Sequence, residues 1–234
     1  MQVLCGSAVE VLKQLPKESV DTVFTCPSPF GYYEKEEENL IGAETHIMKY
    51  ILHLQNLCNA CRPVLKSTGS LFIQLGDQFH TNGTLMGIPL WFEGHMKNDK
   101  EWLLNDRLIW HRTEKHQLKN YKDKGFLKNY EFIFHYVKQN DFYFNYKSKY
   151  ARTSIHSYPI EDTYYTNEFD SGLPYQLSEM VIDTTVPKGG IILDPLCGSA
   201  KVGVVAKRMN RDFIGIDINP ETVELCGIRL GLHQ

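Results

Sequence analysis

Residues 190–217 contain the pattern that most constrains the fold of this chain. An apolar run at 190–193 predicts a short buried strand, and the Cys-Gly-Ser turn after it opens a segment with helical spacing of apolar residues. A second apolar run, at 213–216, ends on Asp217. A strand, tight turn, helix and strand with an acid at the second strand end is the arrangement that holds the hydroxyls of an adenosine ribose. Because Gly198 lets a ligand approach the backbone but no G-x-G-x-x-G is present, we expect a nucleoside ligand without a pyrophosphate.

The length and composition favour one α/β domain spanning residues 1–234. With 42% hydrophobic content, the 234 residues can bury one core but not two large ones. The formal net charge is −3, so contact with nucleic acid must come from a local basic patch. Six cysteines without a secretory signal favour a reducing compartment, and no apolar run approaches the roughly 18 residues of a membrane span. We therefore expect a soluble, cytoplasmic protein without membrane contact.

A proline-rich pentapeptide follows another predicted strand. Residues 20–25 predict the strand, and Cys-Pro-Ser-Pro-Phe occupies 26–30 at its carboxyl end. Ligands of open α/β sheets bind at the carboxyl ends of the strands. Because Pro27 and Pro29 fix the backbone and carry no N–H, they leave carbonyl groups free to point into a cleft. The pentapeptide is therefore a candidate catalytic loop.

The turn after residue 193 resembles the cofactor motif of the S-adenosylmethionine-dependent amino-methyltransferases of DNA, commonly D-P-F-x-G-S-G-T-T-G. Here the motif is D-P-L-C-G-S-A-K-V-G at 194–203, so Leu196, Ala200 and Lys201 depart from the common pattern. Leu173-Pro174 stands where the family has a His-Pro pair against the methionine end of the cofactor. The resemblance implies that S-adenosylmethionine is bound by Asp194, Leu196, Cys197, Gly198, Ser199, Asp217 and Pro174.

Residues 26–30 resemble the catalytic motif of the same family, [D/N/S]-P-P-[Y/F/W]. In that motif a side-chain oxygen and a proline carbonyl accept hydrogen bonds from the target amine, and the aromatic ring stacks on a base flipped out of the helix. The resemblance assigns catalysis to Pro27, Ser28, Pro29 and Phe30, although anchoring on Phe30 places Pro27 at the polar position. With one inserted residue, Cys26 or Ser28 supplies the polar side chain and Pro27 or Pro29 the carbonyl. We favour Ser28 with the Pro27 carbonyl; the alternative is a site without its acceptor, slow or inactive.

A basic segment lies between the two motifs. Residues 107–128 hold seven Lys or Arg residues against two acids, interleaved with histidines and aromatic residues. On a chain of net negative charge this local excess is the candidate phosphate-contacting surface. A solvated loop is the alternative interpretation. The residues expected to contact duplex DNA are Arg112, Lys115, Lys119, Lys122 and Lys124.

The order of the segments resembles the permuted β class of these enzymes. Residues 1–146 form the catalytic half, 147–171 a loop and 172–234 the cofactor-binding half. Residues 129–137 and 141–145 predict a hairpin, because no crossover helix fits between them. The expected fold is a doubly wound, Rossmann-like methyltransferase sheet, mostly parallel with an antiparallel edge hairpin.

The resemblance implies transfer of a methyl group to the exocyclic amine of a flipped base in DNA, with cytosine N4 favoured by the serine. Adenine N6, an RNA or protein amine, and a catalytically silent DNA-binding subunit are the alternatives. We expect neither a metal nor a covalent enzyme intermediate. The expected partner is duplex DNA, with a cognate restriction enzyme and a homodimer as open options.

Overall fold

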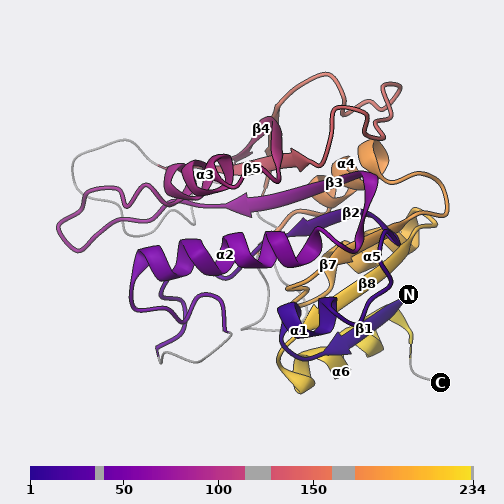
Figure 1. The fold of residues 1–234 in the computed structure, drawn as a ribbon, viewed down its shortest axis with the longest axis horizontal. Coiled ribbons are helices and arrows are strands. Elements are labelled where there is room, and N and C mark those ends of the chain that lie inside the picture. The colour runs from indigo at the N-terminus through magenta and orange to yellow at the C-terminus, as the bar shows by residue number, and fades with distance from the viewer. Residues whose placement is uncertain (35–39, 114–127, 160–171, 233–234) are drawn as a thin grey trace.

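The computed structural model describes residues 1–34, 40–113, 128–159 and 172–232. Strands and helices alternate along most of this chain (Figure 1). The strands are β1 (Gln2–Cys5), β2 (Val20–Thr25), β3 (Leu65–Leu75), β4 (Leu103–Arg112), β5 (Tyr130–Val137), β6 (Ile155–Tyr158), β7 (Ile191–Asp194) and β8 (Asp212–Asp217). The helices are α1 (Ala8–Leu12), α2 (Ile47–Cys61), α3 (Ile88–Asn98), α4 (Tyr175–Thr185), α5 (Lys201–Arg208) and α6 (Pro220–Leu230).

The strands form one sheet in the order β1-β8-β7-β2-β3-β5-β4-β6 within the described residues. The first five strands in this order, β1, β8, β7, β2 and β3, are parallel to one another. The next strand, β5, runs antiparallel to both of its neighbours, β3 and β4. At the far edge β6 lies parallel to β4. The expected mostly parallel sheet with an antiparallel region toward one edge is therefore confirmed.

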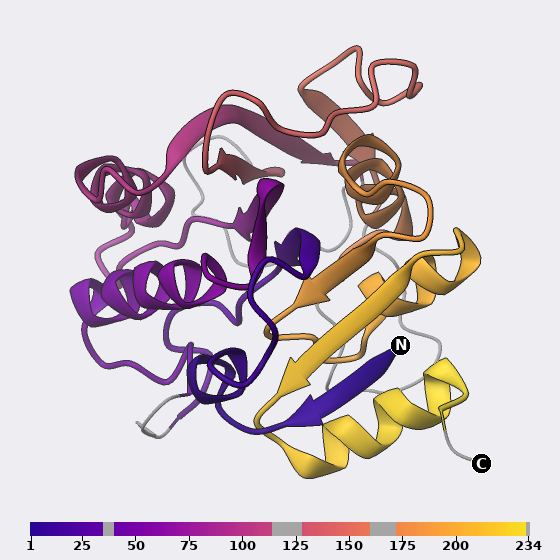
Figure 2. The same cartoon turned by 45° about the vertical axis from the view of Figure 1, so that its right-hand side comes forward.

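Helices cover both faces of the sheet (Figure 2). Alternate residues of one strand supply the two cores, because successive side chains point to opposite faces. On β2, Val23 packs with α1, α2 and α3, whereas Phe24 packs with α4, α5 and α6. On β3, Ile73 belongs to the core under α1, α2 and α3, and Phe72 belongs to the core under α4, α5 and α6. This double cover is the winding that the sequence predicts.

The antiparallel pairing involves different strands from those predicted. Residues 141–145 do not form a strand, so the expected hairpin with 129–137 is wrong; β5 pairs with β3 and β4 instead. The N–H of Tyr143 donates to the carbonyl of Thr68 (2.9 Å) and that of Asn145 to the carbonyl of Thr184 (2.8 Å). Because these two N–H groups donate to two different elements, β3 and α4, residues 141–145 do not form the hydrogen-bond ladder of a strand.

The predicted loop at 147–171 contains the edge strand β6. Its four residues pair with the carboxyl end of β4, where Ile109 lies opposite Ile155. Residues 160–171 of this predicted loop lie outside the described residues.

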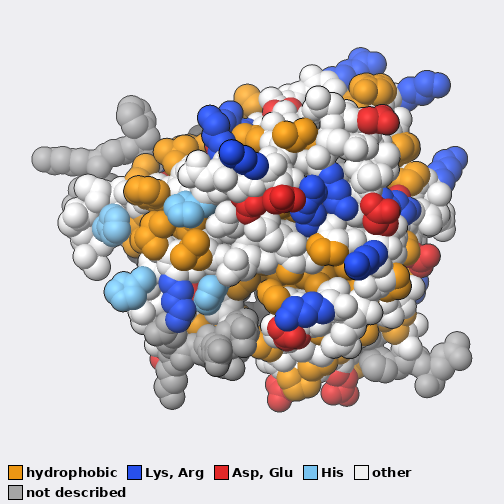
Figure 3. Space-filling view, in the orientation of Figure 1, with side chains coloured by type: hydrophobic (Ala, Val, Ile, Leu, Met, Phe, Trp, Pro, Cys, Tyr) orange, Lys and Arg blue, Asp and Glu red, His pale blue; other side chains and the backbone are white. Residues whose placement is uncertain are grey.

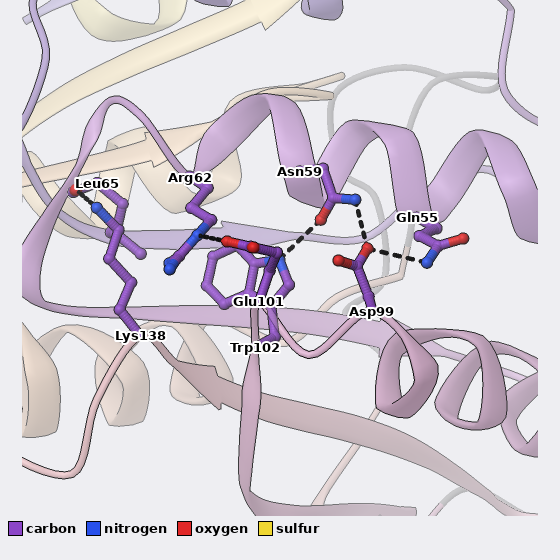
Figure 4. Close-up of polar contacts among 8 residues, drawn as sticks. All are labelled: Gln55, Asn59, Arg62, Leu65, Asp99, Glu101, Trp102 and Lys138. Atoms are coloured by element: carbon purple, nitrogen blue, oxygen red, sulfur yellow. Dashed lines mark hydrogen bonds and ion pairs between the residues drawn. The ribbon is translucent and has the colours of Figure 1, made fainter.

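Side-chain hydrogen bonds fix α2 to the turn between α3 and β4 (Figure 4). Gln55 donates to Asp99 over 2.9 Å, and Asn59 donates to the same carboxylate. The indole N–H of Trp102 donates to Asn59 over 2.9 Å. These contacts fix the start of β4, whose far end reaches the site described below.

Because His135 is buried, we expect the stability of the protein to depend on pH in a specific way. Its ring lies between Asn105 and Ser70, and burial lowers its pKa to about 3. An unfolded histidine has a pKa of about 6.5, so below that pH the unfolded chain binds a proton that the folded chain does not. We expect the free energy of unfolding to fall by roughly 1.4 kcal/mol per pH unit below about pH 6.5 on account of this residue.

Urea unfolding at several pH values between 7 and 5 checks this expectation, with His135→Gln as the comparison. The variant is expected to be less stable at pH 7 but to lose less stability on acidification. Groups that titrate in both proteins cancel in the difference. Parallel slopes for the two proteins would exclude His135 as the cause.

Candidate active site

One cavity of about 1940 Å³ lies at the carboxyl ends of β2, β3, β7 and β8. Because β5 runs opposite to its neighbours, its amino end reaches the same edge, as does the carboxyl end of β4. The cavity exceeds the roughly 300–1,000 Å³ of a typical small-molecule pocket. It therefore has room for a nucleoside cofactor and a second planar ligand.

The turn between β7 and α5 forms one end of the cavity. Asp217 Oδ2 accepts from the N–H of Gly198 (3.1 Å), and its Oδ1 accepts from the N–H of Asn219 (2.9 Å). Gly198 has a φ of +46°, and a Cβ added there would meet no atom within 4 Å. The carboxylate is thus held at the rim of an open space, with lone pairs left for the hydroxyls of a ribose.

Asp194, at the end of β7, has 5% of its surface exposed. Burial raises its pKa to about 7, against a lowering by the hydrogen bond from the N–H of Leu196. This bond, 3.1 Å long, closes the turn so that Leu196, Cys197, Gly198 and Ser199 all line the cavity. The structure brings these predicted cofactor residues together.

Two departures from the common cofactor motif have visible consequences. Ala200, where the family has glycine, is buried with a φ of +54°, a left-handed conformation that costs a residue with a Cβ about 1–2 kcal/mol. Lys201 is buried in the cavity wall, and its Nζ donates to the carbonyl of Leu173 over 3.1 Å. Pro174, the remaining predicted cofactor residue, is buried just before α4, and its neighbour Leu173 lines the cavity.

The catalytic loop follows β2, and its carbonyl groups differ in their partners. The hydroxyl of Tyr50 donates to the carbonyl of Ser28 (2.9 Å), and the N–H of Tyr32 donates to the carbonyl of Pro29 (3.1 Å). Within the described part of the chain, no hydrogen bond reaches the carbonyl of Pro27. Among the described residues, the Pro27 carbonyl therefore has no hydrogen-bond partner, unlike the carbonyls of Ser28 and Pro29.

The side chains of the loop point in different directions. Cys26, Pro27, Ser28 and Pro29 line the cavity, and the Ser28 hydroxyl lies 3.4 Å from that of Tyr33. Phe30, expected to stack on a base, does not line the cavity. It packs against the ring of Tyr50, with 5.8 Å between ring centroids.

The thiol of Cys26 is held in its neutral form. Burial raises its pKa well above the usual value, and the charges of Asp194 and Glu131 raise it further, with Lys201 opposing them. A thiolate is the form of cysteine that attacks an electrophile. Cys26 is therefore poorly suited to act as a nucleophile.

A buried carboxylate, a turn open to a ligand and a loop with an unpaired carbonyl line one cavity, as the resemblance to an amino-methyltransferase requires. A family model described as DNA methylase, of the N6 and N4 type, matches residues 20–227. The chain belongs to this DNA methylase family. The predicted family and its fold are confirmed, and the protein is a DNA methyltransferase of the N4/N6 amino-methyltransferase type.

Two Type II methyltransferases are similar to this methylase along nearly the whole of its chain. The Type II methyltransferase M.XycI of Xanthomonas campestris pv. cyanopsidis is 25% identical, over 96% of this chain and 86% of its own length. M.HpaI of Haemophilus parainfluenzae is 26% identical, over 98% and 74%.

Solved structures share the fold. The cytosine-N4-specific PvuII DNA methyltransferase superposes with a TM-score of 0.84 at 17% identity, over 97% of this chain and 85% of its own. A Thermus thermophilus protein, solved in complex with S-adenosyl-L-methionine, has a TM-score of 0.73 at 18% identity, over 99% of this chain and 93% of its own.

Tyr50 offers a test of how the methylase holds its catalytic loop. Tyr50→Phe removes the hydroxyl that donates to Ser28, so we expect a fall of about tenfold in kcat and about 1 kcal/mol in stability. The matched control is Tyr136→Phe, since Tyr136 is equally buried and its hydroxyl has no partner among the described residues. Steady-state kinetics and thermal unfolding of both variants check the expectation. Equal activity in the two variants would show that the Tyr50 hydroxyl does not position the loop.

The expected DNA contacts fall largely outside the described residues. Lys115, Lys119, Lys122 and Lys124 all lie within 114–127. Arg112 is described and lines the cavity, where its Nη1 lies 3.2 Å from Oε1 of Glu131. Its side chain is 14% exposed, so this arginine is a cavity residue more than a surface residue.

On the face shown in Figure 3, Lys and Arg side chains are mixed with Asp and Glu, and the described residues form no continuous basic surface there. Hydrophobic side chains gather over α2 and α3, where Leu52, Leu90 and Trp91 are exposed. Four of the five residues expected to contact phosphates lie in the segment 114–127, outside the described residues.

Several cavity residues carry no signal in the sequence motifs. They are Gln74, Arg112 as a cavity residue, Glu131, and Gly6 to Val9 after β1. The strand β1 pairs with β8, and this pairing brings the N-terminal segment of the expected catalytic half to the cofactor turn. Only the strand order could have revealed this placement.

Three further findings concern the described residues only. They contain no group of three His, Cys, Asp or Glu side chains able to hold a metal ion. None of their helices is long and apolar enough to cross a membrane. The Cys58 and Cys61 pair on α2 is buried, and burial raises the pKa of both thiols.

Proposed function

We propose that this methylase transfers a methyl group to the exocyclic amine of a base flipped out of duplex DNA at a specific site, with cytosine N4 as the acceptor. The observation that carries the proposal is that one cavity holds both the turn at Asp194 and Asp217 and the loop with the unpaired Pro27 carbonyl. The methyl donor and the base can then meet between them.

S-adenosylmethionine is the methyl donor, and it supplies an electrophilic methyl group on a sulfonium. The described residues fit it: the Asp217 carboxylate is oriented to accept from the ribose hydroxyls, and Gly198 leaves the approach open. We assign Asp194, Leu196, Cys197 and Ser199 to the wall of the same site, with Pro174 behind Leu173. The buried ammonium of Lys201 is a fitting partner for the carboxylate of the methionine moiety.

The loop at 26–30 acts on the amine. The amino nitrogen of cytosine is a weak nucleophile because its lone pair is conjugated into the ring. A hydrogen bond to the Pro27 carbonyl favours the rehybridised nitrogen that attacks the methyl carbon. Ser28 lines the cavity on the same loop, so we assign its hydroxyl to contact with the base, and Pro29 keeps the loop rigid.

The state of Cys26 favours an amine over a ring carbon as the acceptor. Methylation at cytosine C5 requires a thiolate to attack the ring, and Cys26 is held neutral by burial. Duplex DNA is the proposed partner, and we assign its contacts to Lys115, Lys119, Lys122 and Lys124. Because the relatives are named Type II methyltransferases, we also propose that a restriction enzyme of the same sequence specificity accompanies this methylase in the cell.

Transfer of label from S-[methyl-³H]adenosylmethionine tests the substrate class. Purified protein is incubated with mixed-sequence duplex DNA, structured RNA or denatured protein at equal mass. The proposal predicts that label is incorporated into duplex DNA alone. Label in RNA or protein but not in DNA would replace the proposed substrate.

A further inference from the structure

Two side chains of α6 donate hydrogen bonds to the cofactor turn, residues 195–200 between β7 and α5. Cys226 and Arg229 are three residues apart, so they lie on the same face of the helix. The thiol of Cys226 donates to the carbonyl of Gly198 (2.7 Å), and Nη1 of Arg229 donates to the carbonyl of Ser199 (2.7 Å). Because Gly198 and Ser199 line the cavity, α6 contacts the segment that the cofactor has to reach.

The second amino group of Arg229 connects the cofactor turn to the start of α4. Its Nη2 donates to the hydroxyl of Tyr175 over 2.7 Å, and Tyr175 follows Pro174 directly as the first residue of α4. The guanidinium group of arginine is planar and rigid, so its two amino groups hold their acceptors in a fixed geometry. Arg229 therefore fixes the Ser199 carbonyl and the Tyr175 hydroxyl relative to each other.

Two more cations lie over the ring of Tyr175. Nζ of Lys201 is 5.8 Å from the ring centroid, and Cζ of Arg208 is 5.0 Å from it. At such distances a cation is attracted to the face of an aromatic ring. Lys201 also donates to the carbonyl of Leu173 and lines the cavity. The start of α4 is thus bound to α5 through Lys201 and to α6 through Arg229.

The cofactor turn depends on contacts of this kind because its backbone is strained. Ala200 has a φ of +54°, a conformation that persists in a residue with a Cβ only where the surrounding structure enforces it. The turn also determines how the ribose-binding carboxylate is oriented, since Oδ2 of Asp217 accepts from the N–H of Gly198. A displacement of the turn would therefore change the cofactor site on both sides.

We propose that Arg229 is a positioning residue of the cofactor site, which keeps the cofactor turn and the start of α4 in the arrangement that S-adenosylmethionine requires. Arg229 is not among the described residues that line the cavity, so it acts through Ser199 and Tyr175. The inference rests on the part of the proposed function that places S-adenosylmethionine at this turn. It is independent of which base accepts the methyl group.

The test compares Arg229→Met with Arg208→Met in the full-length protein. Arg208 is an exposed arginine over the same ring, and within the described part of the chain it forms no hydrogen bond with the cofactor turn. Because the lost bonds come from a charged group, Arg229→Met is expected to raise the Kd for S-adenosylmethionine about tenfold or more, as measured by calorimetry. Arg208→Met is expected to bind with wild-type affinity.

Steady-state kinetics separates positioning from a general loss of stability. In Arg229→Met we expect the KM for S-adenosylmethionine to rise with its Kd, and kcat at saturating cofactor to stay within about twofold of wild type. A variant that was merely partly unfolded would show the opposite pattern, a lower kcat with an unchanged KM. That pattern, or wild-type affinity in Arg229→Met, would overturn the proposal.

Tyr175→Phe tests the same contact from its other end. Phenylalanine keeps the ring under the two cations but removes the hydroxyl that accepts from Arg229. We expect its Kd to rise about threefold, and the double variant with Arg229→Met to bind no more weakly than Arg229→Met alone. Two losses that multiply would contradict a shared contact, and should Arg229→Met not fold, wild-type affinity in Tyr175→Phe would do so. Wild-type protein that binds S-adenosylmethionine but methylates no base would contradict the proposed function and leave this inference intact.

Discussion

Replacing Asp217 by alanine is expected to weaken the binding of S-adenosylmethionine by at least about 100-fold. Two hydrogen bonds from ribose hydroxyls to a carboxylate are together worth about 3 kcal/mol or more, since each bond to a charged group contributes about 1.5–3 kcal/mol. The carboxylate also holds the turn through the N–H groups of Gly198 and Asn219. Isothermal titration calorimetry of the purified variant measures the loss.

The matched control for Asp217 lies at the other end of the same strand. Asp212 begins β8, and its 60% exposed side chain pairs with the N-terminal amine at 3.2 Å. Asp212→Ala is expected to bind S-adenosylmethionine with wild-type affinity. Wild-type affinity in Asp217→Ala as well would remove this carboxylate from the cofactor site.

Replacing Gly42 by alanine is expected to lower kcat about 100-fold without changing the affinity for S-adenosylmethionine. Gly42 lies under the catalytic loop with a φ of +99°, and a Cβ there would come within 2.8 Å of Cβ of Ser28 and 3.0 Å of the Pro29 carbonyl. The loop must shift, and a displacement of about 1 Å at a catalytic group can cost about 100-fold in rate. Steady-state kinetics and calorimetry measure the two quantities separately.

Gly189→Ala controls for backbone strain in this comparison. Gly189 has a φ of +72°, but a Cβ there would meet no atom within 4 Å. The Gly189→Ala variant is therefore expected to lose about 1–3 kcal/mol of stability but to keep its activity. Similar kcat values for the two alanine variants would show that contact with the loop is unimportant.

The fold of residues 190–217 could be predicted from the sequence because each part of this segment has a local signal. The buried strands β7 and β8 appear as apolar runs. Gly198 follows β7, and Asp217 ends β8, at the spacing that the fold requires. The structure brings these residues to one cavity in the predicted arrangement. Such local patterns predict the structure correctly because the residues that contact one another are close in the sequence.

The missed features depend on contacts between distant segments. The aromatic alternation at 141–145 is typical of a strand, but its peptide groups bond to Thr68 and Thr184. The strand β6 is too short to show a period, and only its pairing with β4 defines it. Gln74 looks like an ordinary residue of a buried strand until the register of β2 and β3 places it beside Cys26.

The most direct measurement of the central claim is nucleoside mass spectrometry of duplex DNA after incubation with the protein and S-adenosylmethionine. The proposed function predicts a new N4-methylcytosine peak and no 5-methylcytosine. N6-methyladenine in its place would keep the amine chemistry and reject cytosine as the acceptor. Tight binding of S-adenosylmethionine without any methylated nucleoside would contradict the claim that this cavity methylates a base.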